Sequence, residues 1–154
     1  ALVYISAQLI GAFLGACLMW AAYKKHFDDP EATADDKLGT FSTAPSIAAP
    51  PWNVLTEVLG TFVLVFVIIA FGKTPTELGP LAVALLVVGI GASLGGPTGY
   101  AINPARDLGP RIAHQLLPIP GKRDSNWRYA WVPIVGPCLG GVVAGLLAHA
   151  LNYV

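Results

Sequence analysis

Residues Ala101–Leu108 read AINPARDL, and this stretch decides how the chain is expected to fold. Asn103 followed by Pro104 is a strong helix-start signal, because the Asn carboxamide can cap free backbone N–H groups and Pro has no N–H to leave unpaired. An uncharged stretch of 28 residues, from Leu78 to Ala105, ends here at an arginine. A helix from Pro104 to about Leu116 spans about 20 Å, against about 30 Å of bilayer hydrocarbon. Such a half-spanning helix, with its positive N-terminal end deep in the membrane, is suited to handling polar solutes.

The composition is that of an integral membrane protein. Hydrophobic residues make up 55% of the chain and charged residues 12%, and the mean hydropathy is +0.62. Four segments carry no charge, residues 1–23, 58–72, 78–105 and 129–154, and each is long enough with its flanks for one helical span. We expect the first to be a membrane span and not a signal peptide, because it lacks a basic start and its apolar run is too long. The nine basic and nine acidic residues balance, which argues against nucleic acid as a partner.

The sequence gives no sign of catalytic or metal chemistry. His26, His114 and His149 do not cluster with carboxylates or cysteines at ligand spacing. Cys17 and Cys138 both fall inside expected spans, where a small packing role is the simpler interpretation. No nucleophile–base pair and no phosphate loop is visible. We therefore expect neither an enzyme nor a cofactor.

The charge-free segments predict the order of elements. We expect spans at about Leu2–Tyr23, Trp52–Phe71, Pro80–Leu94 and Tyr129–Leu151, a polar loop Lys24–Pro51, a connection Gly72–Gly79, an irregular segment Gly95–Ile102, the half-helix Pro104–Leu116 and a loop Pro118–Arg128. The aromatics near span ends are either interfacial or core residues: Trp20, Trp52, Trp127, Tyr129 and Trp131. Glycines recur four apart, a spacing that allows close helix approach, at Gly11 and Gly15, Gly91 and Gly95, Gly136 and Gly140, and Gly141 and Gly145.

A weak internal similarity links the first and last spans. Residues Gln8–Ala16 read QLIGAFLGA and residues Pro137–Gly145 read PCLGGVVAG, and aligning them superposes two glycines. Shared apolarity can produce such a match by chance. If the repeat is genuine, the partner of the Asn-Pro-Ala motif falls before residue 1, and we expect a chain that begins in the middle of a two-repeat protein.

These residues resemble the aquaporin superfamily, and within it the aquaglyceroporin or glycerol uptake facilitator branch. The resemblance rests mainly on Gly99–Arg111 (GYAINPARDLGPR), with support from Gly39–Thr43, Glu57 and Trp131–Pro137. It implies an all-α membrane protein, an aquaporin-like helical bundle with a re-entrant half-helix that covers the third to sixth helices and lacks the N-terminal repeat. The last helix of the first repeat would occupy about residues 2–23, the external loop 24–51, and the second repeat 52–154.

Several positions favour the glycerol-conducting branch by this resemblance. They are Gly91, where water channels carry a narrowing histidine, Asp107 and Arg111 after the Asn-Pro-Ala motif, and Pro133 and Ile134, a pair that is usually aromatic in water channels. Ala44 departs from the pattern, because glycerol facilitators usually show an aromatic in this loop. The resemblance also places the loops Lys24–Pro51 and Pro118–Arg128 outside the cell and the Gly72–Gly79 connection inside.

The resemblance assigns pore roles to residues around the half-helix. Asn103 would donate hydrogen bonds to a passing hydroxyl, or else act only as a helix cap. Arg106 would hold two vicinal hydroxyls and repel cations, or else snorkel to the headgroups. Tyr100 would form an aromatic wall beside Gly91, which widens the passage, or else anchor at an interface. Carbonyls near Gly99 and Ala101 would line the pore, and Pro104 and Ala105 complete the motif.

Three further residues are expected to support the pore. By the resemblance, Glu57 accepts hydrogen bonds from N–H groups of the irregular loop, although a wet helix start near Trp52 is the alternative. Asp107 lies in the first turn of the half-helix, where a negative charge complements the helix dipole. Arg111 lies four residues on and faces it.

The sequence therefore predicts a passive, cofactor-free channel for glycerol and similar small neutral solutes, with water also passing. The resemblance implies a homotetramer in the lipid bilayer, in a bacterial inner membrane. Two alternatives stay open. One is a segment of a secondary active transporter, for which Glu57, Asp107 and Arg106 are the candidate coupling groups. The other is a non-conducting structural fragment, if the chain acts alone.

Overall fold

The computed structural model describes residues 1–73 and 79–154 and contains helices but no strand among them. The helices are α1 (Leu2–Ala22), α2 (Lys24–Phe27), α3 (Ala34–Gly39), α4 (Pro50–Phe71), α5 (Pro80–Thr98), α6 (Pro104–Leu116) and α7 (Val132–Ala150). Helices α1, α4, α5 and α7 are long and apolar enough to cross a membrane. The predicted all-α membrane fold is confirmed, and the half-helix has the predicted bounds.

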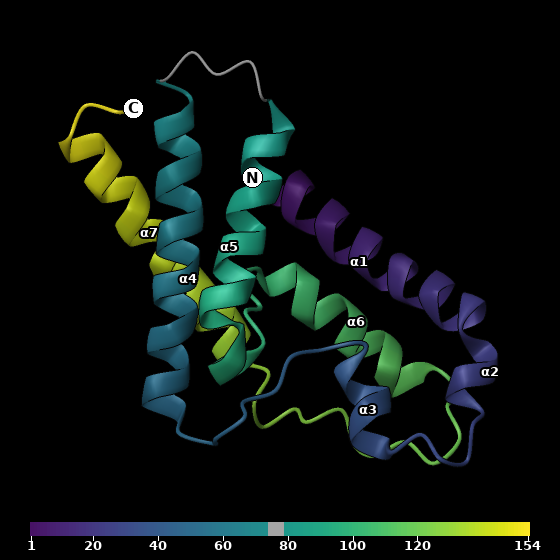
Figure 1. Ribbon diagram of the computed structural model, residues 1–154. Helices are drawn as coiled ribbons and strands as arrows, with labels where there is room; N and C mark the ends of the chain where they lie inside the picture. The colour runs from purple at the N-terminus through teal and green to yellow at the C-terminus, as the bar shows by residue number, and fades with distance from the viewer. Residues whose placement is uncertain (74–78) are drawn as a thin grey trace.

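The long helices pack in two groups, α4 with α5 and α7, and α1 with α6, and the contact between α6 and α7 joins them. Helix α4 lies against α5 and α7, whereas α6 lies between α1 and α7 (Figure 1). Glycines permit two of these contacts. A Cβ on Gly136 would lie 2.5 Å from the Cβ of Glu57, and one on Gly109 would lie 2.8 Å from the Cβ of Ala12. By contrast, a Cβ added at Gly11, Gly15, Gly141 or Gly145 would meet nothing within 4 Å, so only some of the four-residue glycine pairs mark a helix contact.

Helix α5 extends four residues beyond the expected end at Leu94. Gly95 and Gly96 continue the helix, and Pro97 sits in its last turn, where a missing N–H removes only one hydrogen bond. The chain leaves the helix at Gly99, whose φ is +79°. The expected irregular segment is therefore shortened to residues 99–103. The expected connection Gly72–Gly79 falls largely outside the described residues.

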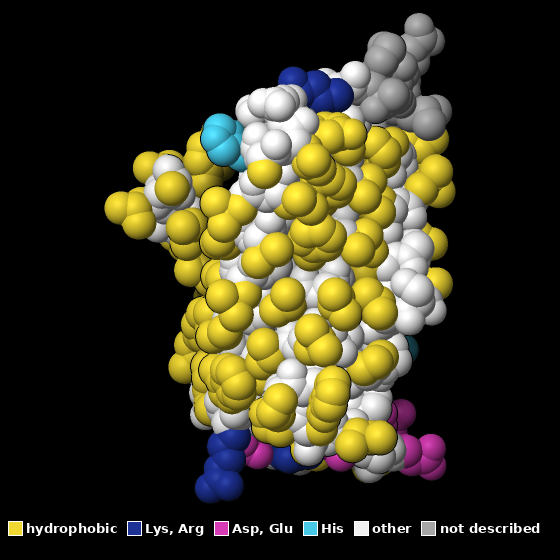
Figure 2. All heavy atoms as spheres, turned by 90° about the vertical axis from the view of Figure 1, so that its left-hand side faces the viewer, with side chains coloured by type: hydrophobic (Ala, Val, Ile, Leu, Met, Phe, Trp, Pro, Cys, Tyr) yellow, Lys and Arg dark blue, Asp and Glu magenta, His cyan; other side chains and the backbone are white. Residues whose placement is uncertain are grey.

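The surface pattern fits a membrane. Figure 2 shows one face with hydrophobic side chains across its middle and charged groups confined to its two ends. Trp52, Trp127 and Trp131 are 70%, 43% and 45% exposed, as interfacial residues are, but Tyr129 is buried. Tyr129 is thus a core residue, the second of the two interpretations that its position allowed.

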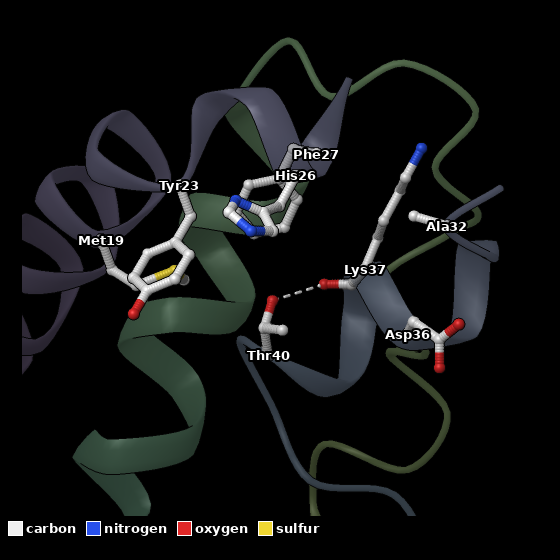
Figure 3. Close-up of a pocket in the computed structure, with 8 residues that line it drawn as sticks. All are labelled: Met19, Tyr23, His26, Phe27, Ala32, Asp36, Lys37 and Thr40. Atoms are coloured by element: carbon white, nitrogen blue, oxygen red, sulfur yellow. Dashed lines mark hydrogen bonds between the residues drawn. The ribbon is translucent and has the colours of Figure 1, made fainter. Parts of the chain in front are cut away.

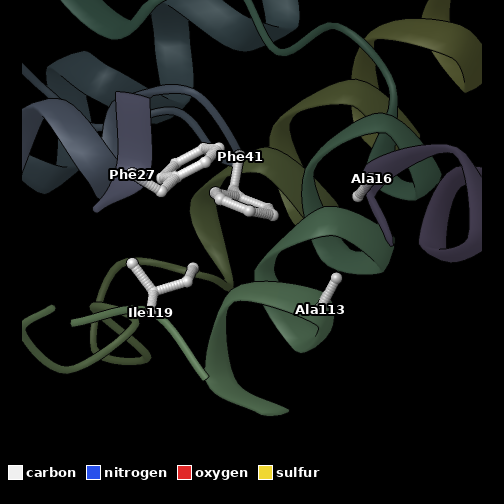
Figure 4. Close-up of a cluster of buried hydrophobic side chains, with 5 residues drawn as sticks. All are labelled: Ala16, Phe27, Phe41, Ala113 and Ile119. Atoms are coloured by element: carbon white, nitrogen blue, oxygen red, sulfur yellow. The ribbon is translucent and has the colours of Figure 1, made fainter. Parts of the chain in front are cut away.

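The expected polar loop Lys24–Pro51 is more ordered than its composition suggests. It contains α2 and α3, and α3 begins with a capping box in which Thr33 and Asp36 bond each other's backbone N–H. The loop packs on α1, on α6 and on the 118–128 loop in one cluster of buried apolar side chains, namely Ala16, Phe27, Phe41, Ala113 and Ile119 (Figure 4). The Nζ of buried Lys37 donates to the carbonyl of Pro120 at 2.8 Å. The two loops therefore form one layer at the same end of the molecule.

Candidate functional site

The half-helix α6 begins as the sequence predicted. Asn103 is extended, with φ −158° and ψ 119°, and its Oδ1 accepts hydrogen bonds from the N–H groups of Ala105 (2.9 Å) and Arg106 (3.3 Å). Pro104 fills the first helical position, where no N–H is needed. Because Oδ1 is occupied by the cap, the carboxamide NH2 of Asn103 is the part of the side chain that can donate to a solute.

The loop before Asn103 is strained. Tyr100 and Ile102 have φ values of +40° and +44°, in a region that non-glycine residues seldom adopt. Such conformations cost about 1–3 kcal/mol each and persist only when neighbours fix them. The path of this loop therefore needs strong local support.

Glu57 supplies that support from α4. Its Oε1 accepts from the Thr98 hydroxyl at 2.7 Å and from the Ala101 N–H at 3.0 Å, and its Oε2 accepts from the Ile102 N–H at 2.7 Å. Glu57 is 1% exposed. The hydrogen bonds expected of it are present, and the alternative of a wet helix start is wrong.

Tyr100 lies against the glycine side of α5. A Cβ on Gly91 would lie 3.0 Å from its Cζ, and a Cβ on Gly95 would lie 3.1 Å from its Cδ1. The space beside Gly91 is therefore filled by the tyrosine ring. The missing side chain of Gly91 therefore lets this ring lie against α5. That Gly91 widens a passage stays a prediction.

Arg106 projects from the start of α6 and is exposed. Its backbone N–H is used by Asn103, whereas its guanidinium has no hydrogen bond or ion pair to any residue that the structure describes. The guanidinium is thus available for a ligand.

Asp107 and Arg111 form a buried ion pair, 1% and 0% exposed. The Nε and Nη2 of Arg111 donate to Oδ1 at 2.8 and 2.7 Å. The pair also joins three segments. Thr43 donates to Oδ2 from its N–H (2.8 Å) and its hydroxyl (2.7 Å). Arg111 donates in turn to the carbonyls of Thr43 (2.9 Å), Ser125 (2.7 Å) and Asn126 (3.1 Å).

These partners of the ion pair were not predicted. Thr43 belongs to the Gly39–Thr43 stretch that supports the resemblance, but its role was not apparent from it. Ser125 and Asn126 contribute backbone carbonyls, which every residue has, so no sequence signal could have found them.

The C-terminal end of α6 is also fixed by a cation. The Nζ of Lys122 donates to the carbonyls of His114, Gln115 and Leu117 at 2.7, 2.8 and 2.7 Å. Burial lowers the pKa of Lys122. A positive charge at this end interacts favourably with the negative end of the helix dipole. Both ends of the half-helix are therefore held by residues outside it.

A cavity of about 370 Å³ lies away from this site, between the end of α1, α2 and α3 (Figure 3). Its lining includes Met19, Tyr23, His26 and Thr40, and none of the predicted pore residues. Thr40 donates to the carbonyl of Lys37 at 2.9 Å. The described residues contain no group of three or more His, Cys, Asp or Glu side chains that could hold a metal ion.

The sequence matches the family described as Major intrinsic protein over residues 1–148. The chain belongs to the major intrinsic protein family. Within it, the chain is 60% identical over 153 residues to the glycerol uptake facilitator protein of Bacillus subtilis, a match that covers 96% of this chain and 54% of the relative. It is 52% identical over 153 residues to a probable glycerol uptake facilitator protein of Thermotoga maritima, covering 96% and 64%.

A solved structure of a protein with the same fold is also similar. The X-ray structure of the aquaglyceroporin from Plasmodium falciparum matches with a TM-score of 0.73 and 28% identity, over 95% of this chain and 62% of that one. The chain thus spans between half and two thirds of the length of these proteins. The resemblance drawn from Gly99–Arg111 is confirmed, and this major intrinsic protein chain is a multi-pass membrane protein.

Proposed function

We propose that the chain forms part of the wall of a passive channel for glycerol and similar small neutral solutes, with water also passing, and that it is not an enzyme. The observation that carries the proposal is the surface at the start of α6. The strained loop supplies a tyrosine ring laid against glycine, Asn103 at its end supplies an amide donor, and Arg106 in the following turn supplies an exposed guanidinium. The names of the relatives, glycerol uptake facilitators, support the same solute.

The chemistry of this surface suits a polyol. The guanidinium of Arg106 offers a planar fork of donors that matches two vicinal hydroxyls, and the ring of Tyr100 can lie along the carbon chain. Asn103 donates from its free NH2, and carbonyls near Gly99 and Ala101 supply acceptors. The half-helix begins at Pro104 and Ala105 with the positive end of its dipole. This positive end and the charge of Arg106 both repel cations and protons.

We further propose how the chain fits a whole channel. Residues 2–23 are the last helix of a first repeat, 24–51 the external loop, and 52–154 the second repeat. The channel lies in the inner membrane of a bacterium as a homotetramer, because exposed apolar side chains cover the long helices and need lipid or other subunits as neighbours.

The test uses a chimera in which the N-terminal part of the Bacillus subtilis relative precedes Ala1. We expect it to pass glycerol in a vesicle swelling assay, whereas residues 1–154 alone insert into membranes without solute-specific permeability. Gly91→His in the chimera should reduce glycerol flux about tenfold more than water flux, since a side chain there displaces the Tyr100 ring into the passage.

Gly89→Ala is the matched control, because Gly89 is on the same helix with nothing within 4 Å of an added Cβ. It should leave both fluxes unchanged. A chimera that passes no more glycerol than empty vesicles would overturn the proposed function. Equal losses of glycerol and water flux in Gly91→His would overturn the constriction assigned to Gly91 and Tyr100.

A further inference from the structure

Thr43, in the loop of residues 24–51, lies beside both flanks of the strained loop of residues 99–103, which we call the pore loop. Its hydroxyl and its N–H both donate to Oδ2 of Asp107, the residue that follows Arg106. On the other flank, a Cβ on Gly99, the residue before Tyr100, would lie 3.3 Å from the Cβ and Cγ2 of Thr43. One side chain of the external loop therefore lies close to the chain immediately before the candidate constriction and bonds to it immediately after.

Glu57 and Thr43 hold the pore loop at different points. Glu57, on α4, binds the side chain of Thr98 and the N–H groups of Ala101 and Ile102. None of these bonds reaches beyond Ile102. The first turn of α6, from which Arg106 projects, is instead held to the external loop by the bonds between Thr43 and Asp107.

Thr43 is itself firmly anchored. It is 6% exposed, and its carbonyl accepts from Nη2 of Arg111 at 2.9 Å. Two residues earlier, Phe41 is 2% exposed and packs on the ring of Phe27, with centroids 5.5 Å apart, and on that of His114, at 5.4 Å. The external loop is thus fixed to the body of the protein. Its bonds from Thr43 can therefore hold the Asp107 side chain in place.

We propose that Thr43 is a positioning residue for solute selection: through its hydrogen bonds to Asp107 it sets where Arg106 stands relative to Tyr100. Thr43 is too buried to touch a solute, so its effect passes through Asp107. The inference rests on the proposed function, since it concerns the same constriction, and it adds the external loop to the parts that determine selectivity.

Two substitutions separate the effect of the Thr43 hydroxyl from the effect of its methyl group. Thr43→Val keeps a methyl group beside Gly99 and removes the hydroxyl, which leaves Oδ2 of Asp107 with one donor. Thr43→Ser keeps the hydroxyl and removes the methyl. Thr40→Val is the matched control, because the Thr40 hydroxyl lies in the same loop but donates to the carbonyl of Lys37. A hydrogen bond to a charged buried group is a strong one. The permeabilities of the Thr43→Val and Thr43→Ser variants should therefore differ clearly.

The experiment measures permeability to water, glycerol and a five-carbon polyol in vesicles that hold equal amounts of each chimera. We expect Thr43→Val to change the ratio of glycerol to polyol permeability by about tenfold, while Thr43→Ser and Thr40→Val stay within about twofold of the parent. A merely structural role of Thr43 would lower all three permeabilities together and leave their ratios unchanged. Parent ratios in Thr43→Val would overturn the inference, as would an equal change in Thr40→Val.

Amide hydrogen exchange provides a readout that does not depend on glycerol. Residues 99–107 should exchange faster in Thr43→Val than in the parent, and no faster in Thr40→Val. If the parent chimera passes no glycerol, the proposed function fails, and this exchange measurement alone then decides the positioning role. If Thr43→Val is not recovered from membranes, Thr43→Cys takes its place, because a thiol is a weaker donor. Parent-like exchange in that variant would overturn the inference.

Discussion

Glu57 and Asp107 are both buried carboxylates, each 1% exposed. Glu57 binds the strained loop that precedes Asn103, and Asp107 lies in the first turn of the half-helix that follows it. They are neutralised differently. Glu57 accepts from one hydroxyl and two backbone N–H groups and has no cation among its hydrogen-bond partners in the described chain. Asp107 accepts two bonds from Arg111 and two from Thr43. One carboxylate is stabilised by neutral dipoles and the other by a full positive charge.

The difference reflects what each group holds. The donors to Glu57 come from the contiguous residues 98–102, so this carboxylate fixes the shape of one loop. The Asp107–Arg111 pair bonds to Thr43, Ser125 and Asn126, so it fixes the placement of two separate loops on the half-helix. A loop shape can be held by short-range dipoles, whereas joining segments needs a group with as many donors as a guanidinium.

The largest expected effect follows from breaking the Asp107–Arg111 ion pair. Arg111→Met removes the cation and leaves Asp107 as an uncompensated buried charge, and it also frees the carbonyls of Thr43 and Ser125. Removing one partner of a buried pair costs about 3–5 kcal/mol. We expect the chimera to lose stability by this amount in denaturant unfolding in detergent.

A second substitution tests whether charge is the cause. Asp107→Asn together with Arg111→Met leaves no unpaired charge, so the double variant should be more stable than Arg111→Met alone. If both are equally unstable, the lost bonds to the loop carbonyls, and not the buried charge, dominate the effect.

The next largest effect concerns Glu57. Glu57→Gln keeps the size of the side chain but turns one acceptor oxygen into an NH2 that faces a backbone N–H. Because the loop carries two strained residues, Tyr100 and Ile102, it has little freedom to adjust. We expect a loss of about 2–3 kcal/mol in the same unfolding assay. Glu31→Gln, at an exposed position in the loop of residues 24–51, should have no effect. Equal stabilities of the Glu57→Gln and Glu31→Gln variants would contradict the role of Glu57.

The sequence predicted the half-helix better than its surroundings. Its start at Asn103 and Pro104 is set by local chemistry, a capping side chain and a residue without N–H, and so could be read directly. The end of α5 was misplaced because Gly95, Gly96 and Pro97 favour a break, yet the packing of Tyr100 on Gly95 and the hydrogen bond from Thr98 to Glu57 hold this turn helical. Tertiary contacts there override local propensity.

The same division applies to the site. The Asp107–Arg111 pair lies four residues apart on one helix and was predictable. The bonds between Thr43 and Asp107 join residues 64 apart in sequence, and periodicity gives no information about such contacts. The capping box at Thr33 and Asp36 was a local signal that could have predicted α3, but the polar composition of the loop obscured it.

The smallest expected effect compares one hydroxyl on each carboxylate. Thr98 is fully buried and donates to Oε1 of Glu57 at 2.7 Å, as Thr43 donates to Oδ2 of Asp107 at 2.7 Å. Thr98→Val preserves the shape of the side chain and removes this bond, while Glu57 keeps both of its backbone donors. The loss should be about 1.5 kcal/mol, and Thr98→Ser should recover most of it.

Hydrogen exchange locates the effect of Thr98→Val and so tests the division between shape and placement. If Glu57 fixes only the loop shape, the amides of Ala101 and Ile102 should exchange faster while those of residues 41–43 stay protected. In Thr43→Val, by contrast, the amides of residues 41–43 should exchange faster, because the variant loses the hydroxyl bond that attaches this loop to α6. Faster exchange of residues 41–43 in Thr98→Val, as large as in Thr43→Val, would mean that the two carboxylates act as one cooperative unit, since loosening either would then release both segments.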